Sequence, residues 1–224
     1  MTREDLQNYL ARDIVARKKP DKPFKVGIDG RSASGKSTLA DALGSVLAPS
    51  GLNVLRPSVD GFHHPSEHRY RKGEFSAAGY YEDAYNYPAV IEYLLEPLSG
   101  NVFPVFCRQA AHNWRTDMLD TAPPIQVNAN TVLLFDGLFL FRRELNDYWD
   151  FRILLEIDPA TSVTRALERD TGLQGEADFV RKKYEARYEP AWLIYLTEER
   201  PESKADIIVD NRDYMNPKIR NFFF

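Results

Sequence analysis

The sequence predicts an α/β domain of three layers, in which helices cover both faces of a parallel sheet of about five strands. Apolar runs with the length of buried strands alternate along the chain with helical patterns, and this alternation is typical of a parallel sheet. A glycine-bounded loop from Gly30 to Ser37 joins the first of these runs to the helical pattern that follows it. The 224 residues are enough to bury one sizeable core, so we expect a single domain over residues 1–224.

The composition is that of a soluble globular protein, with 43% hydrophobic and 28% charged residues. The net charge of -4 leaves no broad basic surface, so we expect no nucleic acid partner. No apolar run approaches the roughly 18 residues of a membrane span and the first residues lack an apolar signal core, so we expect no membrane partner and a cytoplasmic location. Cys107 is the single cysteine, which excludes an intrachain disulfide and fits a reducing compartment.

A helix is predicted at the start of the chain, over residues 2–18. Thr2 is followed three positions later by Asp5, which resembles a capping box, and apolar side chains then recur at helical spacing. This helix precedes the first predicted strand. We therefore expect residues 1–20 to form an N-terminal helical extension that packs against the flank of the sheet.

The most specific motif is the loop GRSASGKS, which fits the pattern G-x-x-x-x-G-K-[ST]. In such a loop the backbone N–H groups surround a β-phosphate, Lys36 reaches the β- and γ-phosphate oxygens, and the hydroxyl of Ser37 can ligate Mg²⁺. An ordinary glycine-rich turn is the alternative. The buried strand predicted at 25–28 and the helix predicted from 37 to about 51 favour the phosphate loop and a three-layer P-loop NTPase fold. The predicted phosphate-binding residues are Gly30, Ser32, Ala33, Ser34, Gly35, Lys36, Ser37 and Thr38.

An acidic residue follows the second predicted strand, which covers residues 53–59. Pro57 cannot donate to a strand ladder, so this strand is expected at an edge of the sheet. Asp60 then lies at the carboxyl end of the strand, where open α/β sheets bind ligands. Its carboxylate there could accept the proton of an attacking hydroxyl or hold Mg²⁺ water. The alternative is an aspartate that only caps a turn. His63 and His64 match no zinc-ligand spacing.

The stretch from 67 to 87 is polar, rich in tyrosine and without a clean period, which is typical of a functional loop. Its rings and Asp83 could frame an acceptor molecule, with a ring face stacking on a base or sugar. Tyrosines that only pack a surface loop are the alternative. A helix is predicted over residues 88–95, with Pro88 in its first turn.

The middle of the chain predicts a second acidic strand end. Residues 101–114 alternate loosely, as in a short hairpin or strand, and residues 116–130 are predicted to be a connecting loop. Residues 131–136 form an apolar run that ends at Asp136, and an acid in this position holds the metal shell in P-loop proteins. The predicted metal-binding residues are Ser37, Asp60 and Asp136. Cys107 is not expected to be a nucleophile, because phosphoryl transfer needs no thiol.

The last third of the chain predicts a lid and two further strands. A buried strand at 150–157 leads into a helix at 159–170, whose Arg165 and Arg169 lie four positions apart on one face. These arginines either close over ATP or form a solvated salt-bridge face. Residues 171–200 are expected to be a lid and a mixed-charge helix, and residues 205–209 the fifth strand. The apolar tail, 222–224, is expected to pack on the body of the protein or on a neighbouring subunit, which would make a homo-oligomer.

With these residues placed, the chain resembles the uridine kinase and phosphoribulokinase group of P-loop kinases, from about Phe24 to Asn211. The family's Asp-x-Phe element matches residues 60–62. The resemblance implies that Asp60 is the catalytic base and that Ser37 and an acidic strand end, here Asp136, complete the Mg²⁺ site. The family's aromatic residue, histidine and arginine after the third strand are matched loosely. The matching residues are Phe106, His112 and Arg115.

The chain departs from uridine kinases on the acceptor side. The two aspartates that hold the ribose hydroxyls in that family correspond here to residues 82–86, where only Asp83 is clearly retained. The lid's Arg-Gly-Arg element is replaced by residues 172–175. Residues 60–62 and 79–86 also look like bacterial pantothenate kinases, which share this fold.

These observations predict a kinase that uses ATP and Mg²⁺ to phosphorylate a small-molecule hydroxyl, the 5'-hydroxyl of uridine or of a related nucleoside. A kinase of pantothenate, a sugar or glycerate is one alternative. A non-catalytic nucleotide switch is another, although the chain lacks the Asn-Lys-x-Asp guanine motif of GTPases. The predicted catalytic residues are Asp60 and Lys36. The predicted acceptor-binding residues are Asp60, Phe62, His63, Tyr81, Asp83, His112 and Arg115.

Overall fold

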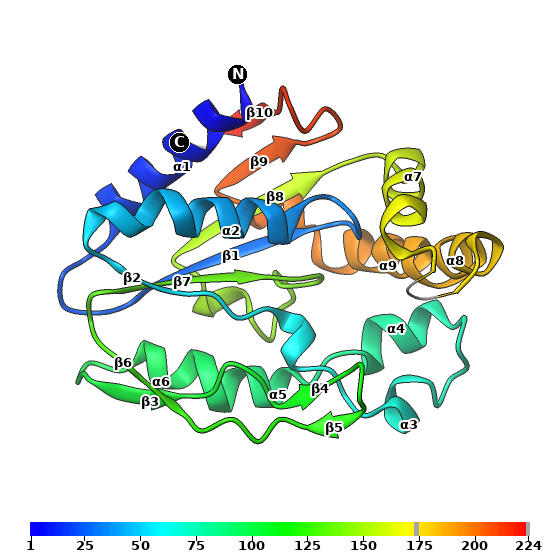
Figure 1. The fold of residues 1–224 in the computed structure, drawn as a ribbon, viewed down its shortest axis with the longest axis horizontal. Helices are drawn as coiled ribbons and strands as arrows, with labels where there is room; N and C mark the ends of the chain where they lie inside the picture. The colour runs from blue at the N-terminus through cyan, green and yellow to red at the C-terminus, as the bar shows by residue number, and fades with distance from the viewer. Residues whose placement is uncertain (173–174, 223–224) are drawn as a thin grey trace.

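A six-stranded, mainly parallel sheet organises the computed structural model, which describes residues 1–172 and 175–222 (Figure 1). The strand order is β10-β9-β8-β1-β7-β2, and only β10 runs antiparallel to its neighbour. The strands are β1 (Phe24–Gly30), β2 (Asn53–Leu55), β7 (Thr131–Asp136), β8 (Phe151–Glu156), β9 (Ile207–Asp210) and β10 (Lys218–Phe222). The α/β fold with a parallel sheet of about five strands is therefore confirmed, and β10 adds a sixth strand that the sequence did not indicate.

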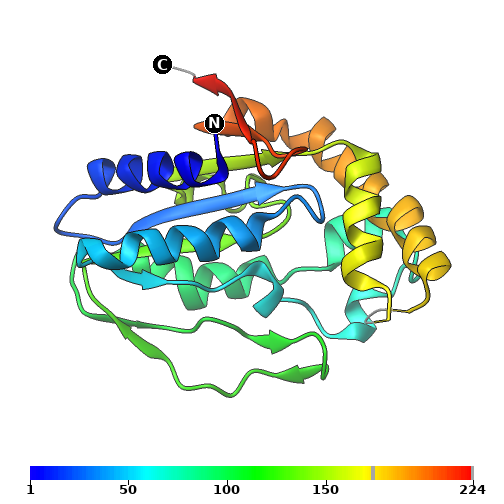
Figure 2. The same cartoon turned by 45° about the horizontal axis from the view of Figure 1, so that its top comes forward.

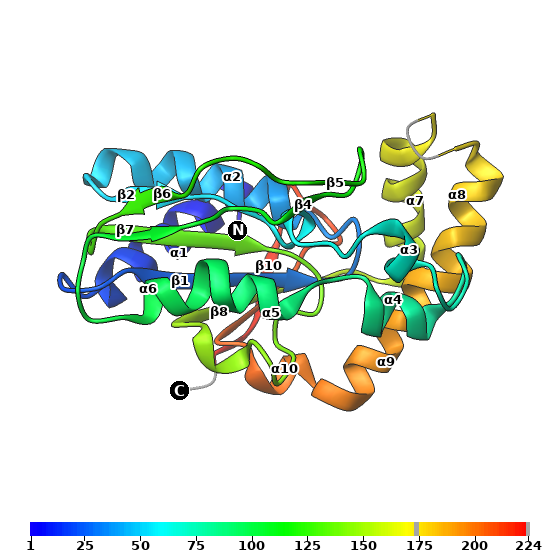
Figure 3. The same cartoon turned by 90° about the horizontal axis from the view of Figure 1, so that it is seen from below.

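Helices cover both faces of the sheet and form the outer two layers. Helices α1 (Arg3–Arg17) and α2 (Lys36–Leu47) lie on one face, and the segment from α5 to α6 with α9 and α10 lies on the other (Figure 3). The helices after α2 have the following bounds: α3 (Ser66–Arg69), α4 (Ala77–Asp83), α5 (Tyr87–Val90), α6 (Glu96–Ser99), α7 (Pro159–Asp170), α8 (Ala177–Lys183), α9 (Glu189–Glu199) and α10 (Pro201–Lys204). No helix among residues 1–172 and 175–222 has the length and apolar character needed to cross a membrane.

The continuous apolar run in β7 is explained by burial on both sides. Val132 and Leu134 pack into the core beneath α1 and α2, whereas Leu133 and Phe135 pack into the core on the opposite face. All six residues of β7 are buried. A strand that is covered on both faces needs no polar alternation, which is why the sequence pattern identified it.

The second strand is shorter than predicted. β2 ends at Leu55, residues 56–58 are irregular apart from an isolated bridge at Ser58, and a single 3₁₀ turn, Val59–Gly61, follows. β2 pairs only with β7, so it lies at an edge of the sheet, as Pro57 indicated. Ser58, just before this turn, forms an isolated bridge with Asp136. The bridge holds the turn that contains Asp60 next to the end of β7.

The tyrosine-rich stretch predicted to be an irregular loop contains two short helices, α3 and α4. The Ser76 hydroxyl accepts a hydrogen bond from the Gly79 N–H and caps α4. The stretch lacked a helical period because the tyrosines pack in several directions, against one another and against Phe139. The predicted helix at 88–95 is part of a longer helical segment, Tyr87–Ser99, with one π-helical turn at Ile91–Leu95.

Residues 101–130 form two small antiparallel pairs beside the main sheet. They are β3 (Val105–Cys107) with β6 (Ile125–Val127), and β4 (His112–Asn113) with β5 (Met118–Leu119). The expected connecting loop thus contributes one strand to each pair. Cys107 is buried, and burial raises the pKa of its thiol to about 11, which agrees with its expected lack of a nucleophilic role.

The carboxyl ends of the parallel strands point toward α7 and α8, which stand beyond the end of the sheet (Figure 2). A π-helical turn, Tyr184–Tyr188, continues α8 into α9, so the residues expected to form a lid and a mixed-charge helix are helical from Ala177 to Glu199. Helices α7 and α8 and this π-helical turn are together called the lid. Part of the replaced lid element, residues 173 and 174, lies outside the described residues. So do residues 223 and 224, and with them the expectation for the apolar tail.

Candidate active site

The loop after β1 has the backbone conformation that its glycines require. Gly35 has φ +94°, and a Cβ on Gly30 would lie 2.4 Å from the carbonyl oxygen of Leu155. Lys36 begins α2, is buried, and its Nζ donates to the carbonyl oxygens of Gly30 and Arg31, both at 2.9 Å. The lysine therefore lies across the loop that is predicted to receive the phosphates.

Burial lowers the pKa of the Lys36 ammonium to about 8, because desolvation disfavours the charged form. The negative charge of Asp136 partly offsets this effect. Bound phosphates would act in the same direction as Asp136, since they also favour the ammonium. The lysine is thus placed to gain charge stabilisation when an anion enters the loop.

Three neighbouring elements hold the loop from outside. The Asn211 amide, just after β9, donates to the Ser34 carbonyl oxygen at 2.7 Å, and Ser162 on α7 donates to the Ser32 carbonyl oxygen at 2.9 Å. The hydroxyls of Ser32 and Tyr184 lie 2.9 Å apart. The loop conformation therefore depends on residues from the last parallel strand and from the lid as well as on its own glycines.

The strand that leads into the loop is anchored by a buried carboxylate that the sequence analysis missed. Asp29 is fully buried, and it accepts hydrogen bonds from the Gly30 N–H at 2.7 Å, the Leu140 N–H at 2.9 Å and the Tyr195 hydroxyl at 2.5 Å. Burial raises the pKa of Asp29, and these donors partly compensate. The tyrosine ties α9, on one face of the sheet, to the start of the phosphate loop.

Two of the predicted metal-binding residues are in direct contact. The Ser37 hydroxyl donates to Asp136 Oδ2 at 2.6 Å, and Asp136 Oδ1 accepts from Arg56 Nη1 at 2.7 Å. A hydroxyl and a carboxylate are the hard oxygen donors that Mg²⁺ prefers, and Mg²⁺ sites usually add substrate phosphates and water. Within residues 1–172 and 175–222, no group of three or more His, Cys, Asp or Glu could hold a metal ion alone. These residues therefore fit a Mg²⁺ ion that is completed by a nucleotide.

Asp60 is placed by its backbone and is exposed to solvent. Its N–H donates to the Ser58 hydroxyl at 3.4 Å, and its carbonyl oxygen accepts from His63 Nδ1 at 3.0 Å. Asp60 lines a cavity of about 160 Å³ that Lys36, Ser37 and Asp136 also line. The structure thus brings all the residues predicted for catalysis and metal binding to one cavity.

His63 lies on the wall of the same cavity and is buried. Burial lowers the pKa of its ring, and the charge of Asp60 partly offsets this. A neutral ring whose Nδ1–H is bound to the Asp60 carbonyl presents Nε2 as an acceptor. The ring centroid of His63 lies 4.6 Å from that of Tyr85.

Five of the predicted acceptor residues do not line this cavity. Phe62 is fully buried beside Phe135, with ring centroids 6.2 Å apart, and Tyr81 packs in the core beneath the Arg142 guanidinium. Asp83 is buried in an ion pair with Arg71 at 2.6 Å. The other two are His112, which is buried, and Arg115, which is exposed and lies over Trp114. In this arrangement these five side chains contact other protein groups and do not line the cavity. Their proposed contacts with an acceptor remain predictions.

The walls of the cavity come instead from α3 and α4 with the residues just after them, from Trp114 after β4, and from the segment of α8 and the π-helical turn that follows it. Most of these side chains are cationic or aromatic. They include Arg69, Tyr70, Tyr80, Tyr85, Trp114, Lys183, Tyr184, Arg187 and Tyr188. No local sequence signal identified the cationic members, because they lie about 115 residues apart and meet only when the lid packs against α3 and α4.

A second cavity, of about 550 Å³, also borders the phosphate loop. Thr38, Arg165 and Arg169 line it, together with residues from two segments that are distant in sequence. These are α1, with Arg3 and Gln7, and the connection between β9 and β10, with Asn211, Tyr214 and Pro217. The volume is in the range of cavities that hold small ligands, about 300–1,000 Å³. Because the two cavities share Lys36 and Ser37, a nucleotide in the second would direct its phosphates toward the first.

The two predicted lid arginines have different neighbours. Arg165 Nη2 donates to the carbonyl oxygens of Asn211 and Arg212, both at 2.9 Å. Arg169 forms a 2.7 Å ion pair with Asp170, which raises the pKa of the guanidinium, and Arg169 lines both cavities. Arg169 therefore stands between the two cavities, whereas Arg165 supports the wall of the second.

The fold and this site define a P-loop protein, with a phosphate loop, an acidic residue at the end of β7 and another in the turn that follows β2. The sequence model of the phosphoribulokinase/uridine kinase family matches residues 25–215. The chain therefore belongs to this family. Relatives of the chain are named as kinases of small molecules.

Relatives of this chain have different acceptors in their names. A pantothenate kinase from Streptococcus pyogenes is 27% identical over 190 residues, with 80% of this chain and 58% of the relative covered. The chain thus spans somewhat more than half the length of that relative. A uridine-cytidine kinase 2-B from Danio rerio is 25% identical over 199 residues, with 84% and 72% covered. A solved structure described as a possible uridine kinase from Bacillus stearothermophilus has a TM-score of 0.70 at 24% identity and covers 92% of this chain and 97% of that one.

Proposed function

We propose that this protein transfers the γ-phosphate of ATP to a hydroxyl group of a small molecule. The observation that supports this most is the meeting of Lys36, Ser37, Asp60 and Asp136 around one cavity next to the phosphate loop. A nucleotide-binding site alone would need no exposed carboxylate facing that loop. An acceptor cavity beside it favours a transfer over a switch.

In this mechanism the protein acts by positioning and by charge. Lys36 and the N–H groups of the loop hold the phosphates, and Ser37 with Asp136 would hold Mg²⁺, which neutralises charge on the phosphate oxygens. Asp60 orients the acceptor hydroxyl and takes its proton as the new bond forms. His63 fixes the backbone of Asp60 through its bond to the carbonyl oxygen. Arg169, at the boundary of the two cavities, would contact the transferring group.

The acceptor that the family resemblance implies is a nucleoside, with the 5'-hydroxyl of uridine as the acceptor group. The rings of Tyr80, Tyr85 and Trp114 around the cavity support this proposal, because a base or a ribose can stack on them. The cations of the same wall favour a second candidate, an acceptor with a negative charge such as pantothenate or glycerate.

A coupled assay of ADP release tests the proposed transfer. The acceptors are uridine, cytidine, pantothenate, ribulose 5-phosphate, glycerate and simple sugars, each with ATP and Mg²⁺. We expect acceptor-dependent ADP release with at least one of them. ATP binding without ADP release on any acceptor would contradict the kinase proposal and favour a non-catalytic switch, and release on acceptors other than nucleosides would contradict the nucleoside assignment alone.

A further inference from the structure

The acceptor cavity has more positive than negative side chains on its walls. Its carboxylates among the described residues are Asp60 and Asp136, both on the side of the phosphate loop. The cations that line it are Lys36, Arg69, Arg169, Lys183 and Arg187. Lys36 and Arg169 belong to the phosphate side, which leaves three cations on the walls formed by α3 and the lid.

Arg69 is the cation whose binding capacity is least used. It is 7% exposed and lines the cavity, yet its Nε has no hydrogen-bond partner. Its Nη2 reaches the Trp114 carbonyl oxygen at 3.3 Å and Asp117 Oδ1 at 3.5 Å, which is at the limit of a hydrogen bond. Asp117 is bound more closely by Ser66, whose N–H and hydroxyl donate to it at 2.9 and 2.5 Å. A buried guanidinium with an unpaired donor is costly unless a ligand supplies an acceptor.

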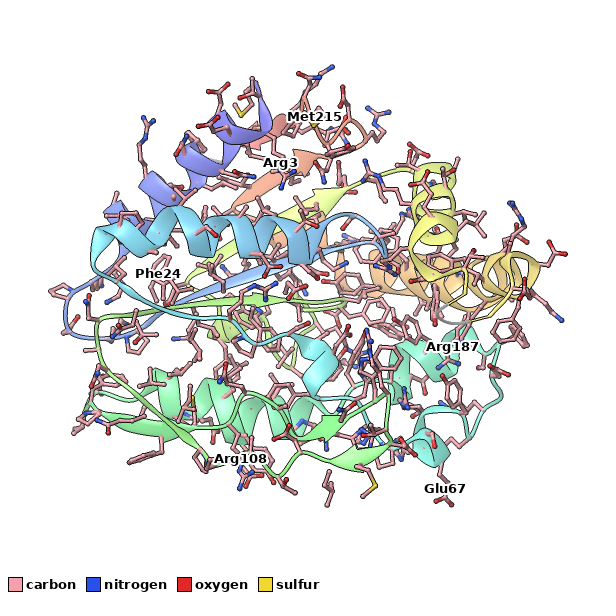
Figure 4. The ribbon with its side chains drawn as sticks, viewed as in Figure 1. Arg3, Phe24, Glu67, Arg108, Arg187 and Met215 are labelled. Atoms are coloured by element: carbon pink, nitrogen blue, oxygen red, sulfur yellow. The ribbon has the colours of Figure 1, made fainter. Side chains whose placement is uncertain are left out.

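The other two cations differ in how far they are already satisfied. Lys183 is buried, and its Nζ lies 3.6 Å from the Glu74 carboxylate, which is too long for a hydrogen bond. Arg187, where α4, α8 and α9 meet (Figure 4), donates to the carbonyl oxygens of Gly73, Glu74 and Ser76 and to that of Arg69. Arg187 therefore holds the chain around α3 in place, and Lys183 adds a second incompletely paired charge.

We propose that the acceptor carries an anionic group, a carboxylate or a phosphate, and that Arg69 binds it while the acceptor hydroxyl faces Asp60. This inference rests on the proposed kinase function and specifies its substrate class. A guanidinium has the fork geometry that matches two oxygens of a carboxylate or phosphate. Lys183 adds charge without directional demands.

The size of the cavity agrees with a compact acceptor. Its volume is about 160 Å³, below the roughly 300–1,000 Å³ of cavities that enclose drug-sized ligands. A hydroxy acid or a short sugar phosphate carries its hydroxyl and its anionic group a few bonds apart, which suits a small cavity that both Asp60 and Arg69 line. A neutral nucleoside would leave the Arg69 guanidinium with only its long contact to Asp117 as an anionic partner.

The test compares acceptors that carry an anionic group with neutral counterparts in which that group is replaced by a hydroxyl or hydroxymethyl group. The pairs are D-glycerate with glycerol, pantothenate with its alcohol panthenol, and ribulose 5-phosphate with ribulose, and uridine is the neutral nucleoside. We expect the anionic member of one pair to have a KM at least about tenfold below that of its neutral partner. Comparing the two carboxylate pairs with the phosphate pair shows whether the anionic group of the acceptor is a carboxylate or a phosphate.

The variant Arg69→Gln carries the decisive comparison. It should raise the KM for the anionic acceptor by about 10- to 100-fold and leave the KM for the neutral partner and the affinity for ATP nearly unchanged. Arg69→Lys, which keeps the charge without the fork, should lie between the two. Arg181→Gln, an exposed arginine on α8, is the matched control and should change none of these values. Thermal unfolding of each variant shows whether the fold is retained.

Two results would overturn the anion site. One is equal KM values within every pair together with no effect of Arg69→Gln. The other is the absence of any heat when the anionic acceptors are titrated into the protein with a non-hydrolysable ATP analogue. If the anions bind and Arg69→Gln abolishes that binding, but no acceptor gives ADP release, the anion site stands and the proposed phosphoryl transfer fails.

Discussion

The variant Asp60→Asn separates catalysis from nucleotide binding. Asp60 is exposed, and its ordering contacts are made by its backbone N–H and carbonyl oxygen, which an asparagine keeps. Substitutions of this kind at exposed positions usually change the free energy of unfolding by less than about 0.5 kcal/mol. A loss of activity in this variant would therefore report on the carboxylate and not on the fold.

The expected loss follows from the role of a general base. Such a base contributes about 10²- to 10⁴-fold to the rate, which corresponds to about 2.7–5.4 kcal/mol at 1.36 kcal/mol per factor of ten. The phosphates are expected on Lys36 and the loop amides, which Asp60 does not contact through its side chain. We therefore expect kcat to fall by two to four orders of magnitude and the Kd for ATP to change by less than about threefold.

The measurements are kcat from coupled ADP release and the ATP affinity from titration calorimetry. Asp21→Asn, an exposed aspartate in the turn before β1, is the matched control and should leave both values unchanged. A fall in kcat of less than tenfold would remove Asp60 from the role of base. A large loss of ATP affinity with a higher Mg²⁺ requirement would instead assign the carboxylate to the metal shell.

Three further predictions concern the phosphate side of the site. The Lys36 ammonium loses its proton as pH rises through about 8, so ATP affinity should fall above that pH and binding should take up a proton. Calorimetry in buffers of different ionisation heat measures this, and Lys36→Arg should abolish the pH dependence. Asp136→Asn removes the charge of a proposed Mg²⁺ ligand and the partner of Arg56, so the Mg²⁺ concentration for half-maximal ADP release should rise at least about tenfold. An unchanged Mg²⁺ titration would exclude Asp136 from the metal site. Tyr195→Phe leaves Asp29 with one donor fewer and should lower the free energy of unfolding by about 1–3 kcal/mol in urea titrations, whereas a neutral effect would mean that water replaces the hydroxyl.

The parts of the fold that the sequence predicted are those with a local cause. β7 was recognisable because burial on both faces leaves an uninterrupted apolar run, and α1 because its capping box is formed as expected, with Thr2 and Asp5 bonded to each other. β10 carried no such signal. It lies at the sheet edge beyond β9, where polar side chains such as Lys218 and Arg220 interrupt the apolar pattern.

The candidate site was predictable where residues lie at or shortly beyond the carboxyl end of a strand. Asp136 ends β7, and Lys36 and Asp60 follow β1 and β2 after a few residues, so a rule about sheet edges placed them together. Asn211 follows β9 in the same way, and the rule applied to that strand would have found it. Arg69 and Lys183 obey no such rule, because their meeting depends on how the lid packs against α3 and α4.

The second cavity joins segments that are more than 200 residues apart in sequence. The Arg3 N–H donates to the Met215 carbonyl oxygen at 3.1 Å, and the two labelled residues lie close together in Figure 4. A ligand that binds in this cavity only when α1 and the β9–β10 connection are in place suppresses the local opening of these segments. The suppression factor is 1 + [L]/Kd, where [L] is the free ligand concentration, and it is about 100-fold when [L] is a hundred times Kd. Amide hydrogen exchange in the first turns of α1 would then report on ligand occupancy at the phosphate loop, although α1 belongs to a different segment of the chain.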